Sequence, residues 1–114
     1  MASLAFLLPI LPGKEETDIQ MLERFTSGDD EEAFGQWHRS HGVRRHAVWH
    51  QKTPDGTVAI VLLEADDIEA ALRGTATSDE PFDQQFRDFV KDVHGVDLAN
   101  DPPADVVPVI DWRA

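Results

Sequence analysis

The chain has 114 residues, 41% of them hydrophobic, which predicts one domain, residues 1–114, with a single modest core. Ten Lys and Arg residues stand against 22 Asp and Glu, so the formal net charge of −12 excludes nucleic acid and anionic membrane surfaces as expected partners. The chain has no cysteine, which excludes disulfides, thiolate metal sites and a cysteine nucleophile and makes the cytoplasm the expected location.

The first part of the chain predicts a strand followed by two helices. An apolar run predicts a strand over residues 3–11, at an edge or a bulge because Pro9 cannot donate to a ladder. The run lacks the basic flank and cleavage site of a secretory signal. Residues 15–26 carry acidic residues in the first turn and apolar residues three apart, which predicts a helix. A second helix is expected over residues 30–40, with Gly42 as its stop.

The rest of the chain predicts a hairpin, two helices and a last strand. These elements are expected at residues 43–52, 57–65, 66–73, 81–94 and 106–112. Pro54 and Gly56 suit the turn of the hairpin, and Pro108 marks the last strand as an edge strand or a bulged one.

This order of elements predicts an α+β fold, the ferredoxin-like βαββαβ arrangement of an antiparallel sheet, with extra short helices. Residues 58–63 are apolar on both faces of their strand, whereas one layer of helices covers only one face of a sheet. A second copy of the chain is the economical cover for the other face. We therefore expect a homodimer whose two sheets pack face to face as a dimeric α+β barrel.

Several short motifs carry a resemblance to known proteins. They are Leu11-Pro12-Gly13-Lys14, Ala47-Val48-Trp49 with Gln51, Glu64-Ala65-Asp66-Asp67, Ser78-Asp79-Glu80-Pro81-Phe82-Asp83 and His94-Gly95-Val96-Asp97-Leu98. With them the chain resembles, over residues 5–98, an uncharacterised bacterial family of the dimeric α+β barrel superfamily, distantly similar to antibiotic biosynthesis monooxygenase-like proteins. That superfamily includes cofactor-free monooxygenases, polyketide cyclases, muconolactone isomerases, haem peroxidases and amino-acid-sensing domains. The resemblance thus implies either an enzyme or a binding protein.

The hairpin holds the candidate catalytic residues, His46 and His50. If Thr53 and Thr57 lie opposite each other, His46 lies opposite Glu64, and a carboxylate beside an imidazole raises its pKa toward the range that proton transfer needs. The alternative is an ion pair at the end of the sheet. Neither histidine belongs to the pattern of the family that the chain resembles.

The candidate ligand-binding residues lie on the other face of the same strand. Trp49 and Gln51 would place an amide beside an indole, as a site for a small hydrophobic ligand requires. If this face meets the helices, Trp37 or His41 would border the cavity. Glu64, opposite His46, is a further candidate ligand-binding residue. The alternative is packing in the core or at an interface.

We expect no metal and no cofactor. His38 and His41 lie three apart on a helix and could share an ion, but His46 and His50 would be about 13 Å apart along a strand. His94 precedes a glycine and is expected to cap its helix, with a haem-ligand role as the alternative.

Two hypotheses for function follow. The first is a small-molecule-binding enzyme, similar to cofactor-free monooxygenases, cyclases or isomerases, that uses histidine acid/base chemistry. The second is a non-catalytic module that binds a metabolite or a protein.

Overall fold

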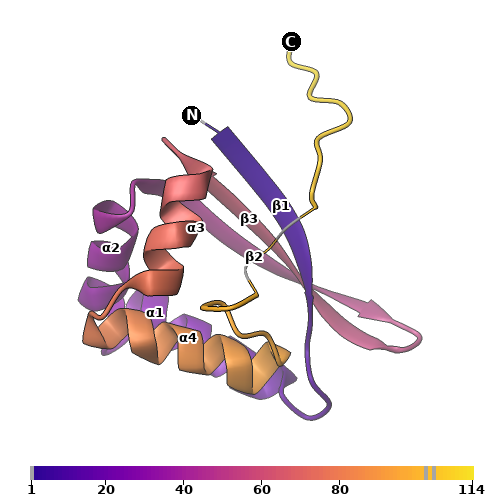
Figure 1. The fold of residues 1–114 in the computed structure, drawn as a ribbon. Coiled ribbons are helices and arrows are strands. Elements are labelled where there is room, and N and C mark those ends of the chain that lie inside the picture. Colours follow the sequence, from indigo (N-terminus) through magenta and orange to yellow (C-terminus); the bar gives the residue numbers. More distant parts are fainter. Residues whose placement is uncertain (1, 102, 104) are drawn as a thin grey trace.

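A computed structural model describes residues 2–101, 103 and 105–114 and shows four helices against one face of a three-stranded sheet (Figure 1). In chain order the elements are β1 (Ala2–Pro9), α1 (Glu15–Ser27), α2 (Glu31–Ser40), β2 (Val43–Thr53), β3 (Gly56–Ala65), α3 (Ile68–Thr77) and α4 (Pro81–His94). The strand order is β1-β3-β2 and both pairings are antiparallel. The α+β class is confirmed, with element bounds close to those expected as far as residue 94.

The last expected strand is not formed. Residues 105–114 have no regular secondary structure, and they extend away from the sheet past β1 (Figure 1). A strand at this position needs a layer to cover it, whereas the side chain of Val109 is 96% exposed. The described part of the chain therefore has three strands, and the complete βαββαβ arrangement is absent from it.

The helices end where local chemistry requires. Gly42 after α2 and Gly95 after α4 adopt φ angles of 70° and 71°, the left-handed conformation that glycine tolerates best. At the start of α3 the side chain of Asp67 accepts a hydrogen bond from the Ala70 backbone N–H. Helix α3 continues four residues beyond the expected end, and Arg87 of α4 donates to the Thr75 carbonyl in its last turns at 2.8 Å.

Aromatic side chains form the core between the helices and the sheet. Phe25 of α1 is fully buried, and its ring lies 5.3–6.0 Å from four other phenylalanine rings. These rings belong to Phe34, Phe82, Phe86 and Phe89. Phe25 therefore joins α1 to both α2 and α4, and the cluster supports the helices above the cleft described below.

The hairpin has a different register from the one expected. Thr53 pairs with Gly56 and not with Thr57, so the turn holds two residues, and the Thr53 hydroxyl donates to the Gly56 carbonyl at 2.7 Å. His46 then lies opposite Leu63, while Glu64 pairs with Arg45, so the expected His46–Glu64 pairing is wrong. Because the pairing is shifted by one residue, the β2 side chains that were expected on one face of the sheet lie on the other.

The face of the sheet turned away from the helices carries apolar side chains. We call it the outer face; its residues include Ala5, Leu7, Ala47, Trp49, Ile60 and Leu62. Leu7 is 64% exposed and Trp49 is 48% exposed. Gln51 and Glu64 share this face by strand alternation, so the expectation that Trp49 and Gln51 border one cavity with Trp37 and His41 is wrong.

No helix in the described ranges is long and apolar enough to cross a membrane.

Candidate functional site

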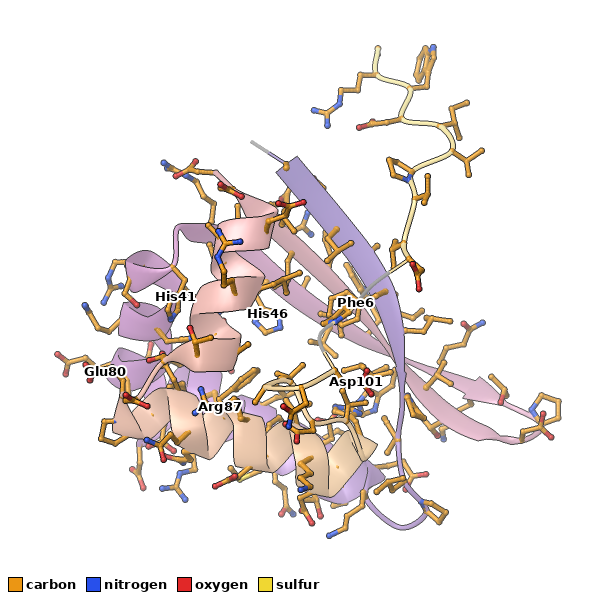
Figure 2. All side chains as sticks on the ribbon, viewed as in Figure 1. Phe6, His41, His46, Glu80, Arg87 and Asp101 are labelled. Atoms are coloured by element: carbon orange, nitrogen blue, oxygen red, sulfur yellow. The ribbon has the colours of Figure 1, made fainter. Side chains whose placement is uncertain are left out.

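A cleft of about 460 Å³ opens between the helices and the inner face of the hairpin. Helix α1 forms one wall, α2 closes one end, and β2 forms the floor. The lining residues are Ile19, Leu22, Glu23, Thr26, Phe34, His46, Val48 and His50. Figure 2 shows His46 between the sheet and the helices. Both candidate catalytic histidines thus line one cleft, whereas none of the candidate ligand-binding residues does.

A smaller, mostly apolar cavity of about 70 Å³ lies deeper, toward α3 and α4. Leu22, His46 and Val48 line both spaces, so the cavity adjoins the floor of the cleft. Trp37 lines the deeper cavity, and its Nε1 is the one buried side-chain polar atom among the described residues that lacks a hydrogen-bond partner. An unpaired buried donor costs about 1–3 kcal/mol, so this N–H would gain from an acceptor.

His50 is held by a buried carboxylate. Its Nε2 lies 2.5 Å from Oδ2 of Asp18, a residue of α1 that is only 1% exposed. On the other side of Asp18, His94 Nε2 lies 3.8 Å from Oδ1. The carboxylate therefore sits between two imidazoles, one of which lines the cleft.

His94 does not cap its own helix. Its Nδ1 lies 2.7 Å from the Pro9 carbonyl oxygen, and because a carbonyl only accepts, Nδ1–H donates this bond. The side chain therefore ties the end of α4 to the end of β1, and the expectation of a helix cap is wrong. Ring burial is nearly complete, so the histidine is shielded from solvent.

His46 has another histidine as its partner. Its Nδ1 lies 3.0 Å from Nε2 of His38, whose Nδ1 lies 2.6 Å from the Phe34 carbonyl oxygen. Burial, and to a lesser extent the neighbouring His38, lowers the pKa of His46 from 6.5 to about 3. Burial also lowers the pKa of His38, although its bond to the Phe34 carbonyl opposes the change. A raised pKa of His46 was expected, and that expectation is wrong.

The two cleft histidines therefore differ chemically. His46 is uncharged at neutral pH and is far too weak a base there for efficient proton transfer, since a general base works best near the operating pH. His50 has a carboxylate at one nitrogen, which fixes the ring and can stabilise an imidazolium. Proton transfer in this cleft is better suited to His50, and hydrogen bonding to His46.

The remaining helix histidine serves the fold. His41 Nε2 lies 3.0 Å from Oδ2 of Asp83, which is 4% exposed on α4, so this contact joins α2 to α4. Because His38 pairs with His46 instead, the two helix histidines do not share a partner. Among the described residues no three His, Asp or Glu side chains gather as metal ligands.

Asp18 was missed in the sequence because acidic residues are common in the first turn of a helix. The available signal was its spacing: Asp18, Leu22 and Phe25 lie at i, i+4 and i+7, so the acid falls on the apolar stripe. Ile19, the apolar residue three positions before Leu22, is instead 41% exposed.

Comparison of the chain with protein-family models, with curated proteins and with solved structures finds no match. The function is therefore argued from the geometry of the cleft, and the resemblance to the dimeric α+β barrel superfamily stays a prediction.

Proposed function

We propose that this protein acts in the cytoplasm as a homodimer that binds a small, largely apolar molecule in the cleft and transfers a proton on it through His50. The observation that carries this proposal is the contact between His50 Nε2 and the buried Asp18 carboxylate at 2.5 Å. An ionised carboxylate only accepts, so Nε2–H donates, and Nδ1 of the neutral ring keeps a free lone pair. Nδ1 has no hydrogen-bond partner in the described ranges and is not a buried atom, so a ligand in the cleft can reach it.

The proton moves from an acidic C–H or O–H of the ligand to Nδ1 of His50. The ligand becomes an enolate or phenolate, and the imidazolium is paired with the buried Asp18 carboxylate. Cofactor-free monooxygenation, cyclisation and isomerisation can each begin with this step. The chemistry thus agrees with the enzyme hypothesis and requires no metal for the proton transfer itself.

The outer face supports the homodimer. In a chain that is 28% charged, the central outer-face residues Leu7, Ala47, Trp49 and Ile60 are all uncharged. Large exposed apolar patches commonly mark interaction sites, and a two-fold axis lets one such face cover an identical one. The histidines and the dimer contact would then use opposite faces of one sheet.

An exchange reaction tests the proton transfer. We expect the wild-type protein to accelerate deuterium exchange at the acidic C–H positions of 6-hydroxy-2-tetralone, a flat ketone that also carries a hydroxyl donor, in D₂O, followed by proton NMR. His50→Gln should slow the protein-dependent exchange by about 100-fold or more. Asp18→Asn should also slow it, while Gln51→Ala on the outer face should not. Equal rates for the wild type and His50→Gln would contradict the proposal.

The second candidate function is a binding module without turnover. The uncharged His46, with a pKa of about 3, favours it, because such a ring orients a ligand and carries no proton at neutral pH. This candidate expects 6-hydroxy-2-tetralone to perturb the NMR signals of cleft residues with no protein-dependent exchange. Exchange that depends on His50 would exclude it.

A further inference from the structure

The Phe34 carbonyl determines which ring nitrogens of His38 and His46 carry hydrogen. That oxygen can only accept, so His38 carries its hydrogen on Nδ1. A neutral imidazole has one N–H, so Nε2 of His38 is bare and accepts from Nδ1–H of His46 at 3.0 Å. Nε2 of His46 is therefore also bare.

The bare nitrogen of His46 is open to the cleft. Within the described ranges, Nε2 of His46 has no hydrogen-bond partner. The atom is not fully buried, so part of its surface is exposed. His46 lines both the cleft and the deeper cavity, so a molecule in either space can contact it. A free neutral histidine prefers its hydrogen on Nε2, which means that this ring is held in its less favoured tautomer by its neighbour.

We infer that His38 is a positioning residue that holds His46 as a hydrogen-bond acceptor, so that the cleft selects apolar ligands carrying an O–H or N–H donor over ligands that carry only acceptors. The selection rests on the proposed function, since it requires a ligand in the cleft. An acceptor-only ligand in the cleft, which Trp37 does not line, would set a lone pair against a lone pair and leave the nitrogen desolvated. This mismatch should weaken binding by about 10-fold to 100-fold. The matching class is a neutral hydroxylated aromatic molecule.

The tautomers can be measured without any ligand. Long-range ¹H–¹⁵N NMR of the imidazoles at pH 7 should show hydrogen on Nδ1 in both His38 and His46. In His38→Asn the amide can still donate to the Phe34 carbonyl but cannot reach the place of Nε2, so the His46 hydrogen should move to Nε2. His38→Phe should have the same effect, and Arg39→Gln, an exposed neighbour, should have none. Hydrogen on Nε2 of His46 in the wild type would overturn the inference.

A matched pair of probes tests the selection. We expect 2-naphthol to bind the wild type about 10-fold to 100-fold more tightly than 2-methoxynaphthalene, which lacks the donor, in NMR titrations. The ratio should fall to near one in His38→Asn. Equal binding of both probes by the wild type would overturn this inference alone. Binding of neither probe would contradict the proposed function and overturn the selection with it.

Discussion

Acid should weaken the fold through His46. Its pKa is about 3 in the folded protein and 6.5 in the unfolded chain, so below pH 6.5 the unfolded chain takes up a proton that the folded protein refuses. The stability that the uncharged His46 gives to the folded protein is fully present above pH 6.5 and is lost as the pH falls toward 3. Between pH 7 and 4.5 it amounts to about 2.5 kcal/mol, since one pKa unit corresponds to about 1.36 kcal/mol. A domain of this size has roughly 6–17 kcal/mol of stability, so the loss is substantial.

Urea unfolding at the two pH values measures this loss, and His46→Asn isolates it. The asparagine amide can still donate to Nε2 of His38 but does not titrate. We expect the free energy of unfolding to fall between pH 7 and 4.5 by about 2.5 kcal/mol less in the variant than in the wild type. Other ionisable groups are common to both proteins and cancel in this difference. An identical pH dependence would refute the reasoning that burial holds His46 uncharged.

Three further predictions concern the core, the outer face and the helix contacts. Phe25→Ala should lower the free energy of unfolding by about 3–5 kcal/mol in urea titrations, because its ring joins three helices; a loss under 1 kcal/mol would contradict that role. Trp49→Lys should convert a wild-type dimer into a folded monomer in size-exclusion chromatography with light scattering, and a monomeric wild type would exclude the homodimer. Gly74→Ala would place a Cβ 2.5 Å from Nδ1 of His41, so thermal melts should show a destabilisation of about 1–3 kcal/mol; an unchanged melting temperature would contradict this contact.

The sequence predicted the elements well because their signals are local. Acidic first turns, Gly42, Gly95 and Pro81 mark helix ends through the conformation and hydrogen bonding of single residues. The final strand failed because strand formation depends on a covering layer, which a local pattern does not reveal. Residues 105–114 have the composition of a strand and lie beyond the layer that could bury them.

The candidate site was predicted only in part, and the turn explains why. A turn of three residues would have placed Trp49 opposite Val61, on the face that the helices cover. The observed two-residue turn places Val48 there, so His46 and His50 face the helices and Trp49 faces away. Both histidines line the cleft, but their partners could not be found from the hairpin. Asp18 lies 32 residues before His50 and reaches it only through the packing of α1 on the sheet.

The composition of the inner face itself argues for a function. A sheet face that only packs against helices is most stable with apolar side chains, and each buried imidazole needs partners to offset its desolvation. On the inner face of β2, His46 lies two residues before Val48 and His50 two residues after it. Each of these histidines has a partner on a helix. These partners satisfy one nitrogen of each ring and leave the other without a bond, within the described ranges, beside the same cleft. Packing alone favours apolar side chains at both positions and gives no reason for two half-satisfied histidines there. A ligand that completes their hydrogen bonds does.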